Sequence, residues 1–133
     1  MANKISTDIA TVVDITARRN DSFYLKTELT QADGTLYTLK DSSQADYNAK
    51  FLVYNGNDET VLGFTSLNSG STSPIYDNII TVSSSDSSLI IEADASKITL
   101  RSGSYKYKFY IYSGSPDNET NTIMVGKFKV VDV

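Results

Sequence analysis

The segment at residues 103–114, GSYKYKFYIYSG, alternates two kinds of side chain, and this alternation restricts the fold more than any other feature of the sequence. Successive side chains of a β-strand point to opposite faces of a sheet, so a period of two predicts a strand with one buried face. We therefore expect a core strand here. The residues assigned to its buried face are Tyr105, Tyr107, Phe109 and Ile111.

The same period recurs along most of the chain. It predicts further strands at residues 23–30, 36–39, 49–54, 60–65, 79–82, 89–93 and 123–131. Between them, residues 94–100 break this pattern. Residues 94–97 are short and polar and can make one helical turn, with Asp94 as its N-cap. The sequence thus predicts an all-β, antiparallel, immunoglobulin-like β-sandwich of about seven to nine strands, with at most one short helical turn. In such sandwiches a tyrosine near the start of one strand donates a hydrogen bond across a corner, and Tyr105 is in the position to do so.

A chain of 133 residues has the length of a single domain. We expect the sandwich to occupy residues 14–133. The N-terminal segment, residues 1–13, shows weak periodicity, and we expect it to be ordered by a partner chain. The loop at residues 66–74 is a second candidate for such a contact.

The residue types present exclude several kinds of chemistry. The chain has no cysteine and no histidine, so it can form neither a Ser-His-Asp triad nor a thiolate or imidazole zinc site. The acidic turn at residues 55–59 lacks the ligand spacing of a calcium loop, and so does the segment at residues 117–119. Glu92 and Asp94 are the best carboxylates for acid–base catalysis, but such residues usually keep a sheet edge soluble. We expect no catalytic residue, no metal, no cofactor and no enzymatic activity.

Charge and hydropathy narrow the range of partners. The net charge is −4, and the twelve basic residues are scattered along the sequence, which argues against nucleic acid as a partner. No apolar run approaches the roughly 18 residues of a membrane span.

One strand face is the best candidate for a binding surface. It consists of Lys106, Lys108, Tyr110 and Tyr112, which alternate with the expected core residues and should point outward. Tyrosine supplies a large contact area at low entropic cost, and lysine can pair with acidic groups. Three interpretations are open: a protein–protein contact, a platform for stacking a carbohydrate, and ordinary cross-strand pairing without a binding role.

Three stretches of the sequence resemble a known family. They are DITARRNDSFYLKTELTQADGTLYTL from Asp14, ITLRSGSYKYKFYI from Ile98 and MVGKFKVVDV from Met124. In this order they are similar to small immunoglobulin-like virion proteins of tailed phages, which include the N-terminal domain of the phage baseplate upper protein. The residues on family positions are Phe23, Asp33, Gly34, Gly103, Tyr105, Tyr107, Gly126, Phe128 and Val130. The departure is Asn20, where the family usually has glycine, and asparagine can replace glycine at positive φ.

The resemblance implies a structural role in a virion. The chain would be a capsid decoration, tail, baseplate or fibre-adaptor protein, made in the bacterial cytoplasm and built into the particle in many copies. Its partners would be other virion proteins. The alternative function is a carbohydrate-binding or host-adhesion module that contacts a glycan of the host surface.

Overall fold

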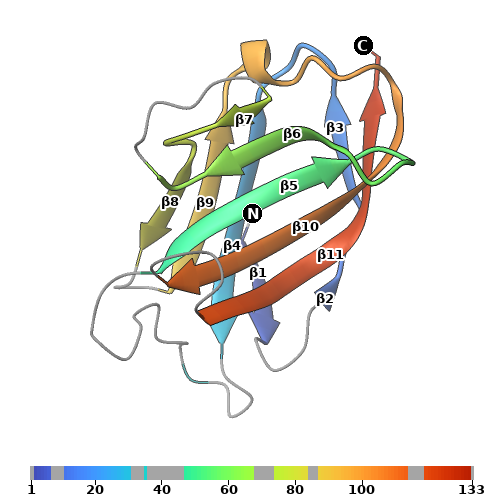
Figure 1. Ribbon diagram of the computed structural model, residues 1–133. Coiled ribbons are helices and arrows are strands. Elements are labelled where there is room, and N and C mark those ends of the chain that lie inside the picture. The colour runs from blue at the N-terminus through green and yellow to red at the C-terminus, as the bar shows by residue number, and fades with distance from the viewer. Residues whose placement is uncertain are drawn as a thin grey trace.

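A computed structural model describes residues 2–6, 11–30, 35, 47–67, 74–83, 87–113 and 119–132 of the chain. Two β-sheets pack face to face, and the strands of the larger sheet run across those of the smaller one (Figure 1). The smaller sheet has the strand order β1 (Ala2–Ser6), β4 (Phe23–Thr30), β9 (Ser88–Ala93), β8 (Ile80–Ser83).

The larger sheet contains seven strands. Its strand order is β2 (Thr11–Val12), β11 (Glu119–Val131), β10 (Gly103–Ser113), β5 (Asn48–Tyr54), β6 (Thr60–Thr65), β7 (Ile75–Tyr76). The seventh strand, β3 (Ile15–Arg18), lies outside this order and pairs with β11. The prediction of a two-sheet, mostly antiparallel β-sandwich is confirmed. The order β1-β4-β9-β8 facing β11-β10-β5 matches the ABED and GFC sheets of immunoglobulin sandwiches.

Short parallel pairings account for the strands that the periodicity did not predict. β1 pairs in parallel with β4, β2 and β3 pair in parallel with β11, and β7 pairs in parallel with β6. The described residues therefore form eleven strands instead of seven to nine. Within the segment at residues 1–13, β1 pairs with β4 of the smaller sheet and β2 pairs with β11 of the larger sheet. The predicted strand at residues 36–39 and most of the loop at residues 66–74 lie outside the described residues.

The predicted helical turn is a 3₁₀ turn, η1 (Ala95–Lys97), with Asp94 at its N-cap position. Asp94 makes no side-chain capping bond to the backbone. Its carboxylate instead accepts a hydrogen bond of 2.5 Å from the Ser96 hydroxyl. Asn20, the departure from the family pattern, has a φ of 61°, which shows that asparagine fills this left-handed position.

A cluster of aromatic rings lies between the sheets and is centred on Phe51 of β5. The Phe51 ring contacts Phe23 from the smaller sheet at 6.1 Å between ring centroids and Phe128 from β11 at 5.8 Å. The rings of Phe64, Tyr107 and Phe109 complete the contacts of Phe51. Tyr107, Phe109 and Ile111 are buried as predicted, and Tyr105 is half-buried against the same core.

Tyr105 also forms the predicted hydrogen bond across the corner. Its hydroxyl donates a 2.8 Å hydrogen bond to the backbone carbonyl of Arg101, four residues earlier. This bond fixes the entry of the chain into β10, which carries the candidate surface on its other face.

Replacing Phe51 with alanine should remove contacts with rings from both sheets. We expect F51A to lower the free energy of unfolding by about 3–5 kcal/mol, the usual cost of truncating a buried phenylalanine. Urea denaturation followed by tyrosine fluorescence would measure it. Val12→Ala, at a side chain that is 74% exposed, is the control and should change stability by less than about 0.5 kcal/mol. Equal effects of the two variants would contradict the central place of Phe51 in the core.

Tyr105→Phe keeps the ring and deletes the corner hydrogen bond. We expect a loss of about 1 kcal/mol in the free energy of unfolding, which is typical of one hydrogen bond. Tyr24→Phe, at an exposed tyrosine of the smaller sheet, is the matched control and should have little effect on urea denaturation. A Tyr105→Phe protein as stable as the wild type would show that the corner bond contributes nothing.

Candidate protein-contact surface

The outer face of the larger sheet is rich in lysine and tyrosine. We call it the Lys–Tyr face and define it by ten outward residues of β5, β10 and β11: Lys50, Leu52, Tyr54, Lys106, Lys108, Tyr110, Tyr112, Val125, Lys127 and Lys129. The strand register places these side chains next to one another, with Lys106 directly opposite both Tyr54 and Lys127. Three of the four predicted surface residues, Lys106, Lys108 and Tyr110, are at least partly exposed on this face.

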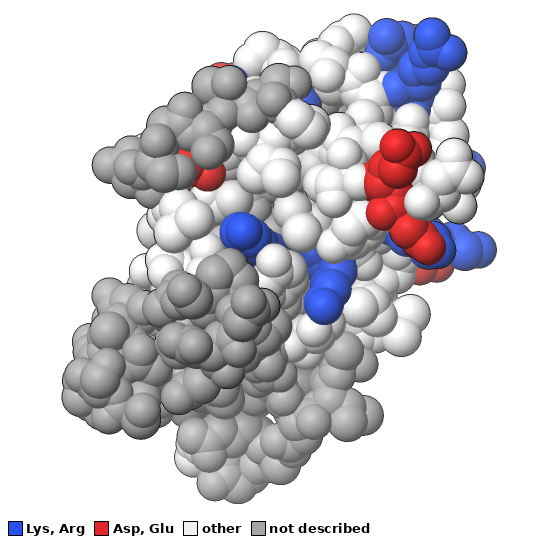
Figure 2. Space-filling view, in the orientation of Figure 1, with Lys and Arg blue, Asp and Glu red and all other residues white. Residues whose placement is uncertain are grey.

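Five of the twelve basic residues of the chain therefore lie on one face of one sheet. They are far apart in sequence, and the register brings them together, so the inference that the basic residues are scattered does not hold in the folded chain. Figure 2 shows lysine side chains over the middle of this sheet and acidic side chains near the end where β5 turns into β6. None of the described outward side chains of β5, β10 and β11 is a carboxylate.

The predicted exposure of Tyr112 is wrong. Only 1% of Tyr112 is accessible to solvent, although it lies on the outward side of β10. The Tyr110 ring lies 5.9 Å from the Tyr112 ring, and the Lys50 ammonium lies 5.6 Å from its centroid, so neighbouring side chains cover it. Among the described residues the Tyr112 hydroxyl has no hydrogen-bond partner. Tyr112 thus supports the surface from beneath and does not itself present a ring to a partner.

The tyrosines of this face are held neutral. Burial raises the pKa of Tyr110 above its ordinary value, and the neighbouring Tyr54 adds to the rise. Burial likewise raises the pKa of Tyr112, with smaller contributions from Tyr110 and Asp77. At physiological pH the phenols are therefore neutral, and the charge of the face comes from its lysines.

The lysines are largely free to meet an external partner. Lys106 Nζ lies 3.1 Å from Asp58 Oδ1, but both side chains are more than 60% exposed, so this pair is weak. Lys108 Nζ lies 5.2 Å from the centre of the Tyr110 ring, a cation–π arrangement. An acidic group from another molecule could displace either interaction at little cost.

A shallow apolar hollow of about 500 Å³ opens at the β2 side of the Lys–Tyr face. Val12, Val125 and Gly126 line it, and Lys106 and Lys127 flank it. Val12 is 74% exposed, which is unusual for a valine in a sheet. Apolar side chains in a pocket ringed by polar groups are typical of the central part of a protein–protein interface.

Close backbone packing forms the wall of this hollow. A Cβ atom on Gly126 would lie 2.3 Å from the Val13 carbonyl oxygen, so only glycine allows the segment between β2 and β3 to approach β11 this closely. The Tyr107 hydroxyl donates a 2.6 Å hydrogen bond to the same carbonyl, and the Lys127 amide donates to Asp14 Oδ1 at 3.1 Å. Sequence reasoning placed Tyr107 and Gly126 on the family pattern but missed that both act on Val13.

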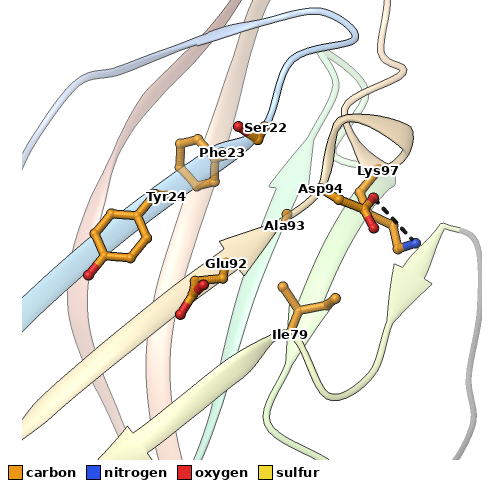
Figure 3. A pocket seen from close by; sticks show the side chains of 8 residues that line it. All are labelled: Ser22, Phe23, Tyr24, Ile79, Glu92, Ala93, Asp94 and Lys97. Atoms are coloured by element: carbon orange, nitrogen blue, oxygen red, sulfur yellow. Dashed lines mark ion pairs between the residues drawn. The ribbon is translucent and has the colours of Figure 1, made fainter.

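The acidic residues that the sequence suggested as metal ligands or catalytic groups lie in a hairpin turn and in a second hollow. In the turn after β5, Asn55 Oδ1 accepts hydrogen bonds from the amides of Asn57 and Glu59, as expected for a hairpin turn. Glu92 and Asp94 line a second hollow, on the smaller sheet, together with Tyr24 (Figure 3). Residues 117 and 118 lie outside the described residues. Over the described part of the chain, no three acidic residues come close enough to hold a metal ion.

The chain matches no known protein-family model, and no curated protein shows significant sequence similarity to it. Within the described ranges, no helix is long and apolar enough to cross a membrane. What the fold and the surface define is an immunoglobulin-like β-sandwich with a lysine- and tyrosine-rich sheet face.

Alkaline titration should reveal the hydrogen bond between Tyr107 and Val13. Burial, with a smaller effect of the Asp14 charge, raises the pKa of Tyr107 well above its ordinary value. The stability that this protonated hydroxyl contributes is therefore fully present below about pH 10, the pKa of tyrosine in the unfolded chain, and is lost as the pH rises further. We expect the wild type to exceed Tyr107→Phe by about 1 kcal/mol at pH 7. That advantage should disappear near pH 11. One pH unit above the pKa of tyrosine in the unfolded chain, ionisation stabilises the unfolded state by about 1.4 kcal/mol, which offsets the contribution of the hydrogen bond.

Urea denaturation of both proteins at pH 7 and pH 11 measures this difference. An advantage of the wild type that stays constant between the two pH values would contradict the buried, proton-donating role of Tyr107.

Proposed function

We propose that the chain is a non-enzymatic structural component of a tailed-phage virion that acts through protein–protein contacts. The observation that carries the proposal is the Lys–Tyr face, in which five lysines surround tyrosines and a shallow apolar hollow beside the exposed Val12. Supporting features are the immunoglobulin-like strand order, the Tyr105 corner and the left-handed Asn20, all of which agree with the family resemblance.

The chemistry of this face favours an acidic protein surface as the partner. Its lysines supply positive charge, and the hollow can accept an apolar side chain that nucleic acid phosphates do not offer. Each contact is shallow, so multiple copies on a repeating lattice would supply the strength of binding.

The arrangement of Tyr110 and Tyr112 favours a protein contact over a stacking platform for a sugar. Tyr112 is buried, Tyr110 is partly covered, and the phenols are tilted at 44° to each other, so no flat row of rings faces the solvent. The protein-contact role is therefore the better supported of the two functions considered.

Charge reversal on the Lys–Tyr face tests the proposal. In particles purified from cells that express Lys108→Glu or Lys127→Glu in place of the wild type, we expect the bound amount to fall on the order of tenfold, because a like-charge contact that costs about 1.4 kcal/mol lowers an equilibrium constant tenfold. Quantitative mass spectrometry of gradient-purified particles measures it. Lys26→Glu, on the smaller sheet, is the matched control and should leave the bound amount unchanged.

Two results would contradict the proposal. One is the absence of the chain from purified particles. The other is saturable binding of the isolated domain to glycans that Lys108→Glu abolishes, which would assign the face to carbohydrate recognition.

A further inference from the structure

The hollow on the smaller sheet has a chemistry that the Lys–Tyr face lacks. It measures about 460 Å³ and lies where β4 and β9 meet the 3₁₀ turn (Figure 3). The residues that matter to its chemistry are Tyr24, Ile79, Glu92, Ala93, Asp94 and Lys97.

An exposed ring and a carboxylate stand side by side at one end. Tyr24 of β4 is paired directly opposite Glu92 of β9, so their Cβ atoms are separated by about 5 Å. Figure 3 shows both side chains projecting from the sheet on the same side. Tyr24 is 55% exposed, and it and Val12 are the two large hydrophobic side chains that the described chain leaves most open to solvent.

The other end of the hollow is electrically balanced. Lys97 Nζ lies 3.7 Å from Asp94 Oδ1, and the two charges cancel. The hydrogen bond from Ser96, with a smaller contribution from Lys97, lowers the pKa of Asp94. Within the described chain, no lysine or arginine forms an ion pair with Glu92. Glu92 therefore gives the hollow one uncompensated negative charge.

We propose that this hollow binds the guanidinium group of an arginine side chain on a partner protein. A planar guanidinium stacks on the phenol ring of Tyr24 and donates two parallel N–H bonds to the Glu92 carboxylate at its edge. The methylene stem of the arginine then lies over Ile79, the apolar side chain beside Glu92 in the lining of the hollow. The ring, the free carboxylate and the apolar floor each match one part of the arginine side chain.

Other ligands fit less well. The charge of Glu92 repels phosphates and carboxylates. A neutral saccharide can donate hydroxyl hydrogen bonds to this carboxylate, but it lacks the positive charge that guanidinium adds. An ammonium group lacks the flat face and the paired donors of guanidinium. The site lies on a different sheet from the Lys–Tyr face, so this inference stands whether or not the proposed function is correct.

An NMR titration of the ¹⁵N-labelled protein with N-acetyl-arginine amide tests the inference. We expect saturable shifts at residues 22–24 and 92–94, which weaken as salt is added. Glu92→Gln and Tyr24→Leu should each weaken binding about two- to fivefold, as expected for one exposed ion pair or cation–π contact. Glu28→Gln, on the same outer sheet face and away from the hollow, should bind as the wild type does.

Parallel titrations separate the alternatives. N-acetyl-lysine amide should bind more weakly than the arginine probe, and methyl α-glucoside should not bind. Saturable binding of the glucoside, or arginine shifts that Glu92→Gln and Glu28→Gln reduce equally, would overturn the inference. Lys108→Glu should bind the arginine probe unchanged, so a failure of this inference is distinguishable from a failure of the proposed function.

Discussion

Packing of the Phe51 ring against rings from both sheets is the interaction on which the rest of the structure depends. Phe23 reaches it from the smaller sheet, and Tyr107, Phe109 and Phe128 reach it from β10 and β11. Because the side chains of a strand alternate, burying these rings turns the residues between them outward. The same packing that fixes the core therefore places Lys106, Lys108 and Lys127 on one surface.

The surface also depends on how the N-terminal part of the chain is attached. β2 and β3 pair with β11, and Tyr107 and Gly126 bring the Val13 carbonyl close to the sheet. This attachment exposes Val12 beside the lysines and forms the apolar hollow. A buried core residue, Tyr107, thus positions part of the surface that we propose to be functional, which links the stability of the fold to its binding face.

Much of the fold could be predicted from local patterns, whereas much of the site could not. The alternation and the turn signals predicted β4, β5, β6, β8, β9, β10 and β11, and the position of Tyr105 predicted its corner. The short strands β1, β2, β3 and β7 are stabilised by parallel pairing with distant segments, which leaves little trace in a local pattern. Lys50 of a neighbouring strand lies over the Tyr112 ring, and the gathering of the lysines depends on the strand register, so neither follows from spacing along one strand.

The two sheets present different chemistry to their surroundings, with lysines on the larger one and the Glu92 carboxylate beside Tyr24 on the smaller one. The central claim is that assembly covers the larger sheet. Lysine acetylation followed by mass spectrometry, on the free chain and on intact particles, tests it most directly. The account predicts that Lys106, Lys108 and Lys127 lose reactivity in the particle while Lys26 does not. Equal reactivity of all four lysines in the two states would contradict it.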